Sequence, residues 1–119
     1  MNERFLVQGP SDARFTILLA HGAGAPMDSP SMTAASTALA ESSFRVARFE
    51  FGYMAARRSS DNRKPPPRAE TLIPRYQAAV AEIKGSGPLI IGGKSMGGPV
   101  ASTIADDLYA KKAIAGLLC

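Results

Sequence analysis

The alternation of apolar and polar stretches along the 119 residues predicts short strands separated by amphipathic helices. Apolar runs with β-branched or aromatic residues indicate three strands, over Phe15–Ala20, Phe44–Phe51 and Leu89–Ile91. A further apolar run, Ala113–Cys119, predicts a fourth strand of the kind that is covered on both faces of a parallel sheet. Arg4–Gln8 precedes a Gly-Pro turn and is compatible with a short edge strand.

Helical periodicity fills the first interval between strands. Ser29 fits an N-cap, and Pro30 then takes the first helical position, where its missing N–H costs nothing. Met32, Ala35 and Leu39 fall on one face of the resulting helix.

The second interval carries an apolar stripe with a period of 3.6 residues: Leu72, Ile73, Tyr76, Ala79, Val80 and Ile83. We expect Thr71 to be the N-cap, because Pro74 would then fall in the first turn, where proline is tolerated. Gly85 is a suitable stop.

The third helix is expected over Met96–Tyr109. Val100, Ile104 and Leu108 share one of its faces, and two lysines at 111 and 112 suit its C-terminal dipole. Strands and helices therefore alternate along the chain. That order predicts an α/β fold, a mostly parallel sheet between two helical layers, formed by one domain over residues 1–119.

Composition limits the setting of this domain. No apolar run reaches the roughly 18 residues of a membrane span, and the start, Met1–Arg4, does not resemble a signal peptide. Cys119 is the only cysteine, so no internal disulfide can form, which is typical of a reducing compartment. We expect a cytoplasmic protein without a membrane partner.

The net charge of +4 comes largely from a basic segment: Arg57, Arg58, Arg63, Lys64 and Arg68. Serines, an Asp-Asn pair and three consecutive prolines separate these residues, which indicates a solvated loop. No aromatic residue is interleaved to stack on bases, so we expect no nucleic-acid partner.

The pentad Gly93-Lys94-Ser95-Met96-Gly97 is the strongest chemical signal. It follows a predicted strand and opens a predicted helix, which is the layout of a nucleophile elbow. Glycines two residues before and after the serine allow a turn too sharp for a Cβ. Ser95 is therefore the candidate nucleophile, and the Met96 N–H is the usual donor to the oxyanion that forms on attack.

A second oxyanion donor is expected from the loop after an earlier strand, and His21–Pro26 is such a loop. Gly22 and Gly24 would let its backbone approach a substrate. His21 is the only histidine, and its position at the end of a strand favours a role in shaping this loop over a role as general base.

A phosphate-binding loop does not fit the same segment. The pattern Gly-x-x-x-x-Gly-Lys-Ser needs glycine where Pro88 stands. The positions that should form the loop, 89–92, mostly hold strand residues.

Three segments in the same order resemble the α/β-hydrolase superfamily: His21–Pro30, Arg48–Met54 with two following arginines, and Gly92–Gly98. They are most similar to a small hydrolase-like family related to dienelactone hydrolase, with animal relatives that include a subunit of the nonspecific-lethal complex. The resemblance implies Ser95 as nucleophile, Ala23 and Met96 as oxyanion donors, and His21, Gly22, Gly93 and Gly97 as supporting residues. It implies hydrolysis of an acyl ester or thioester of a small molecule, without a metal or organic cofactor.

In this superfamily the acid and the histidine of the triad follow the serine along the chain. Neither role has a candidate between Gly97 and Cys119, since Asp106 and Asp107 lie three turns into a helix. The chain is therefore expected to be the N-terminal part of a truncated α/β-hydrolase fold and to have little activity alone. The alternative is a non-catalytic interaction module on the same fold, with the basic segment between positions 57 and 68 as a contact surface for a partner protein.

Overall fold

A computed structural model of the chain describes residues 5–22, 24–58, 68–83, 88–94, 97–110 and 114–118. The strands are β1 Leu6–Gln8, β2 Thr16–Ala20, β3 Arg45–Phe49, β4 Leu89–Gly93 and β5 Gly116–Leu118. The helices are α1 Pro30–Glu41, α2 Gly52–Arg58, α3 Ala69–Glu82 and α4 Gly97–Ala110.

The five strands form one sheet in the order β1-β3-β2-β4-β5. β1 is antiparallel to β3, and the other pairs are parallel. This agrees with the predicted mostly parallel sheet and with a short edge strand near the N-terminus. Ala20 at the end of β2 is paired with both Phe49 and Gly93, so β2, β3 and β4 end at the same edge.

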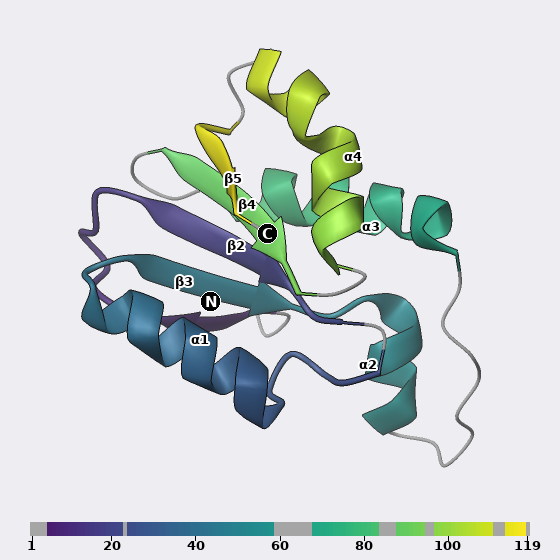
Figure 1. The fold of residues 1–119 in the computed structure, drawn as a ribbon, viewed down its shortest axis with the longest axis horizontal. Coiled ribbons are helices and arrows are strands. Elements are labelled where there is room, and N and C mark those ends of the chain that lie inside the picture. The colour runs from purple at the N-terminus through teal and green to yellow at the C-terminus, as the bar shows by residue number, and fades with distance from the viewer. Residues whose placement is uncertain are drawn as a thin grey trace.

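The central strand β2 packs its alternate side chains against opposite helical layers, as the two-residue period of a strand requires. Leu18 and Ala20 belong to the core that includes residues of α3 and α4, whereas Ile17 and Leu19 pack against Met32 of α1. Figure 1 shows α1 on one side of the sheet, with α3 and α4 away from it. The α/β class and the three-layer α/β/α arrangement are confirmed.

Tyr76 of α3 joins this helix to the sheet. Its side chain is fully buried, and its ring lies edge-on to Phe49 at a centroid distance of 4.9 Å. The hydroxyl accepts the Gly92 N–H at 2.9 Å. It lies 2.9 Å from the Leu18 carbonyl oxygen and 2.5 Å from that of Gly92, and it can donate to either. One phenol therefore bonds to both β2 and β4.

α1 begins as predicted, because the Ser29 Oγ accepts the Met32 N–H and Pro30 follows. Met32, Ala35 and Leu39 share one face of the helix, as predicted, and this face borders a groove described below. Met32 is buried and Leu39 packs against the same core, whereas Ala35 is exposed and Ser36 is buried.

The expected N-cap of α3 was wrong. The helix begins after Arg68, whose carbonyl oxygen accepts both the Thr71 N–H at 3.0 Å and the Thr71 hydroxyl at 2.7 Å. Thr71 thus lies inside the first turn, and Pro74 lies within the helix. Pro74 has no N–H to donate to the Glu70 carbonyl four residues earlier. Both residues are exposed, so water can donate to that carbonyl instead.

The ends of two predicted strands also differ. β3 stops at Phe49, and the Met54 and Ala55 N–H groups bond to the Phe51 carbonyl as α2 begins, a short helix that the periodicity did not indicate. β5 is an edge strand with Leu117 and Leu118 about two-fifths exposed, not covered on both faces.

Some predictions fall on residues outside the described ranges. These are Gly85, the two lysines at 111 and 112, and basic residues 63 and 64.

We predict that Gly92→Ala loosens the contact between β4 and β5. A Cβ at this position would lie 2.0 Å from the Leu118 carbonyl oxygen. Overpacking of this kind costs about 1–3 kcal/mol. Urea unfolding should show that loss, whereas Gly116→Ala should change stability by less than about 1 kcal/mol, because its Cβ would meet nothing closer than 3.8 Å. Equal effects of the two substitutions would contradict the close approach.

We predict that Tyr76→Phe lowers the free energy of unfolding by about 1–3 kcal/mol, because it leaves buried backbone groups of β2 and β4 without their partner. Tyr109→Phe is the matched control, since Tyr109 is 64% exposed. Differential scanning fluorimetry of both variants measures the difference. An unchanged melting temperature in Tyr76→Phe would show that the hydroxyl does not join the strands.

Candidate functional site

The end of β4, where the pentad begins, lies against the end of β2, from which the loop at His21 starts. β4 ends at Gly93 and α4 begins at Gly97, so residues 94–96 connect a parallel strand directly to a helix. The Lys94 N–H donates to the Ala20 carbonyl at 3.1 Å. This bond joins the residue before Ser95 to the residue before His21.

The predicted site residues fall into two groups. Gly93 and Gly97 bound the connection after β4, and His21 and Gly22 open the loop after β2, so the structure brings these four together at one edge of the sheet. Ser95, Met96 and Ala23 lie outside the described residues. Their roles remain predictions.

His21 is fully buried, and both nitrogens of its ring are engaged. The Phe51 N–H donates to Nε2 at 3.1 Å, so Nε2 carries a lone pair. Nδ1 lies 2.6 Å from the Gly22 carbonyl oxygen and must therefore carry the hydrogen. The ring is the neutral Nδ1–H tautomer, and its bonds link the start of the loop to the chain after β3.

Two aromatic rings enclose this histidine. Phe51 and Tyr53 lie edge-on to His21 with centroid distances of 5.2 and 5.8 Å. Burial raises the pKa of the Tyr53 phenol, and the charge of Arg57, which lies 5.3 Å over the same ring, opposes that shift. Tyr53 is therefore neutral near pH 7.

Met27, at the other end of the loop, is held through both of its backbone polar groups. Its N–H donates to the Glu50 Oε2 at 3.2 Å. Its carbonyl oxygen accepts from the Arg48 Nη1 at 2.9 Å. Glu50 and Arg48 are two residues apart in the sequence, and both therefore bond to the backbone of Met27 in the neighbouring loop.

Arg48 is buried and joins two further elements of the fold. The same Nη1 donates to the Thr33 hydroxyl in α1 at 3.1 Å, and Nη2 donates to the Gln8 Oε1 in β1 at 3.0 Å. Burial lowers the pKa of the guanidinium, and the negative charge of Asp28 opposes that effect. An arginine keeps its charge after such a shift, so these bonds are charge-assisted.

Sequence reasoning assigned no role to Arg48 or Glu50, although a signal was present. Ala47 and Phe49 of β3 lie in the core that includes α3, whereas Arg48 falls on the other face and Glu50 follows the strand at the next alternating position. Charged residues are seldom buried unless they are paired. Their presence next to the end of a buried parallel strand is therefore a sign of a polar contact with an adjacent loop.

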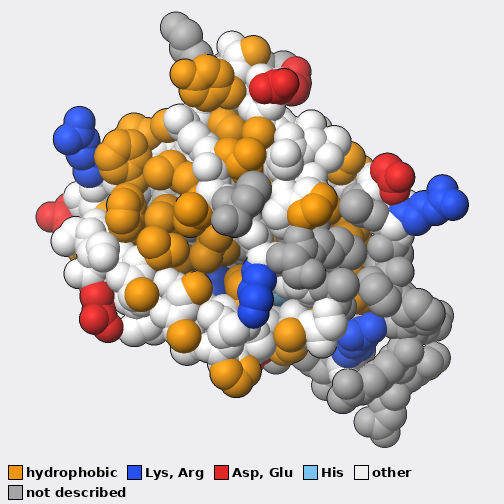
Figure 2. All heavy atoms as spheres, viewed as in Figure 1, with side chains coloured by type: hydrophobic (Ala, Val, Ile, Leu, Met, Phe, Trp, Pro, Cys, Tyr) orange, Lys and Arg blue, Asp and Glu red, His pale blue; other side chains and the backbone are white. Residues whose placement is uncertain are grey.

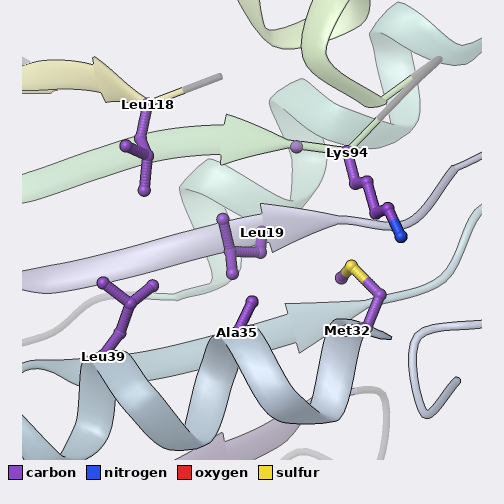
Figure 3. A pocket seen from close by; sticks show the side chains of 7 residues that line it. Leu19, Met32, Ala35, Leu39, Lys94 and Leu118 are labelled. Atoms are coloured by element: carbon purple, nitrogen blue, oxygen red, sulfur yellow. The ribbon is translucent and has the colours of Figure 1, made fainter. Parts of the chain in front are cut away.

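Two hollows meet at Lys94. The smaller, about 180 Å³, is lined by loop and α1 residues: Gly22, Gly24, Ala25, Ser29, Ser31, Met32 and Lys94. The Lys94 ammonium donates to the Ser31 hydroxyl across it. The larger, about 350 Å³, is a groove lined by Leu19, Met32, Ala35, Leu39, Gly93, Lys94 and Leu118 (Figure 3). Figure 2 shows hydrophobic side chains gathered over this part of the sheet, beside α1.

Asp106 and Asp107 are exposed on α4, and the backbone carbonyl of Asp28 accepts from the Thr33 hydroxyl at 3.4 Å. Within the described ranges, no three His, Cys, Asp or Glu side chains lie close enough to hold a metal ion. No helix among the described residues is long and apolar enough to span a bilayer.

We predict that NMR will find His21 in the Nδ1–H neutral tautomer. Long-range ¹H–¹⁵N correlation spectra near pH 7 distinguish the two ring nitrogens, and Nε2 should give the shift of an unprotonated nitrogen. Assignment is simple because the chain has one histidine. A protonated Nε2 would contradict the Phe51 hydrogen bond and would free the ring for another role.

Comparison with known proteins agrees with this architecture. Residues 13–119 match the family described as an alpha/beta hydrolase domain, which covers all but the first strand. No curated protein and no solved structure gives a significant match. Since the family match spans most of the chain and the fold agrees with it, the chain belongs to the alpha/beta hydrolase domain family.

Proposed function

We propose that the chain carries the nucleophile and the oxyanion donors of a serine acyl hydrolase. The observation that supports this most directly is the hydrogen bond from the Lys94 N–H to the Ala20 carbonyl. It holds the strand–turn–helix connection next to a glycine loop at the edge where parallel strands end. Ligands of open α/β sheets bind outside this edge.

In the proposed reaction the Ser95 Oγ attacks the carbonyl carbon of an ester or thioester, and its proton passes to a base. The N–H groups of Ala23 and Met96 stabilise the oxyanion, a contribution worth about 3–4 kcal/mol for each donor. The C–O or C–S bond then breaks, and the alcohol or thiol leaves with a proton. Water adds to the acyl-enzyme, which releases the acid and restores Ser95.

The base in this proposal is a histidine other than His21. The Phe51 N–H occupies its Nε2, and its Nδ1–H points to the Gly22 carbonyl, so His21 supports the loop. The 119 residues contain one histidine, and the proposal places the triad histidine and acid elsewhere in the parent protein. The chain alone would have at most the residual activity of a site without a base.

The finer family placement is also a proposal. The segments His21–Pro30, Arg48–Met54 and Gly92–Gly98 favour the branch related to dienelactone hydrolase, and the first two now have a shared physical role through Met27. We propose a small acyl substrate, no metal or organic cofactor, no nucleic-acid or membrane partner, and a cytoplasmic setting.

One observation favours a second candidate function, a non-catalytic module that binds a partner protein. His21 is locked by its hydrogen bonds, and an apolar groove lies open beside α1. A module of this kind would keep the fold without using Ser95.

A fluorophosphonate probe separates the two functions. Because the chain supplies no base for Ser95, labelling is followed in alkaline buffer, where hydroxide can take the serine proton. The proposal predicts slow covalent labelling, detected by intact mass and peptide mapping, that is faster at Ser95 than at Ser102 and is lost in Ser95→Ala. Ser102→Ala is the control, because Ser102 is an exposed serine of α4. A folded, monodisperse chain labelled at Ser95 no faster than at Ser102 would contradict the enzyme and support the binding module.

A further inference from the structure

We propose that the buried polar end of β3 positions the glycine loop for oxyanion binding. Its parts are the side chains of Arg48 and Glu50 and the backbone N–H of Phe51, here called the β3 clamp. None of them is assigned to contact substrate, so they are positioning residues. The inference rests on the proposed function, because the loop matters only if Ala23 donates to an oxyanion.

The first contact of the clamp is at the start of the loop. The Phe51 N–H holds the His21 ring, and the ring holds the Gly22 carbonyl. Because Nδ1 and Nε2 lie on opposite sides of a rigid five-membered ring, these two bonds fix the orientation of the Gly22 peptide relative to the chain after β3.

The second contact is at the end of the loop. Glu50 accepts the Met27 N–H, and Arg48 donates to the Met27 carbonyl. Both residues are more than nine-tenths buried, at 8% exposure for Glu50 and 5% for Arg48, and their bonds to Met27 are partly buried. Charge-assisted hydrogen bonds are stronger than neutral ones, particularly where the local dielectric is low.

The chain between these contacts runs from residue 22 to residue 26 and includes two glycines. Glycine loses more conformational freedom on ordering than any other residue. A loop with this composition has many accessible conformations unless both of its ends are fixed. A misplacement of about 1 Å in a reacting geometry can cost a hundredfold in rate. Fixing positions 21 and 27 from the end of one strand therefore restricts the conformations open to the loop between them.

The clamp is also tied to the rest of the fold. Arg48 reaches Gln8 in β1 and Thr33 in α1, and the Gln8 amide in turn donates to Thr37. Glu50 follows β3, and its Oε2 accepts a hydrogen bond from the loop itself. Because Arg48 is tied to two other elements, Glu50 is the position at which the placement of the loop is tested.

The test compares Glu50→Met, Glu50→Gln and Arg45→Met. Glu50→Met removes the acceptor for Met27, whereas Glu50→Gln keeps a carbonyl oxygen in the same place. Arg45 is a charged residue at the opposite end of the same strand, where its Nη1 lies 3.4 Å from the Thr16 hydroxyl. Each variant is measured below its melting temperature for the rate of fluorophosphonate labelling and for amide hydrogen exchange of residues 22–27.

The clamp predicts that Glu50→Met is labelled at least about tenfold more slowly than the unchanged chain and exchanges faster at Met27. Glu50→Gln should stay within about threefold in rate, and Arg45→Met within about twofold. The positioning role is overturned if Glu50→Met is labelled at the original rate, or if Arg45→Met slows labelling equally.

Failure of the proposed function gives a different pattern. If the unchanged chain, in the alkaline buffer that replaces the missing base, is labelled at Ser95 no faster than at the exposed Ser102, the hydrolase proposal and the positioning role both fall. Hydrogen exchange still reports separately whether Glu50 holds the loop. Faster exchange at Met27 in Glu50→Met, but not in Glu50→Gln, would then describe a structural clamp on a non-catalytic fold.

Discussion

The contact between the end of β3 and the loop after β2 is the interaction on which the candidate site depends. Parallel strands bring their carboxyl ends to one edge of a sheet, but they do not determine the conformation of the loops there. Here a buried carboxylate and a buried guanidinium hold the backbone of Met27, and a backbone N–H holds His21. Burial of a charge is costly unless hydrogen bonds compensate it, and both groups bond to the Met27 backbone, while Arg48 also bonds to Thr33 and Gln8.

The sheet in turn depends on close backbone approaches that only certain residues allow. Gly92 lies against the Leu118 carbonyl, and the Tyr76 hydroxyl bonds to the same glycine. Gly92 precedes the elbow by one residue, so the position of the turn at 93–97 is coupled to the packing of α3 and β5. The hydrogen bond from the Lys94 N–H to the Ala20 carbonyl then fixes the end of β4 relative to the start of the loop after β2.

Much of the fold could be predicted from the sequence, because the decisive signals were local. The Ser29 cap, the strand that ends at Ala20 and the strand–turn–helix layout around the pentad all follow from a few neighbouring residues. The N-cap of α3 could not be predicted in this way. Thr71 and Arg68 were both available, and the choice was made by hydrogen bonds to the Arg68 carbonyl.

The candidate site was only partly predictable, for a related reason. The pentad and the glycine loop have recognisable sequence patterns, whereas Arg48 and Glu50 act through a residue more than twenty positions away. Long-range polar contacts leave no periodicity in the sequence. The exposure of β5 is similar, since an apolar run indicates a strand but not what covers it.

A crystal structure of the chain after reaction with a fluorophosphonate would test the central claim most directly. The account predicts a phosphonyl group on the Ser95 Oγ, with one phosphoryl oxygen within hydrogen-bonding distance of the Ala23 and Met96 N–H groups. It also predicts that the Met27 contacts with Arg48 and Glu50 are retained. An adduct at another residue, or a phosphoryl oxygen directed away from both N–H groups, would contradict it.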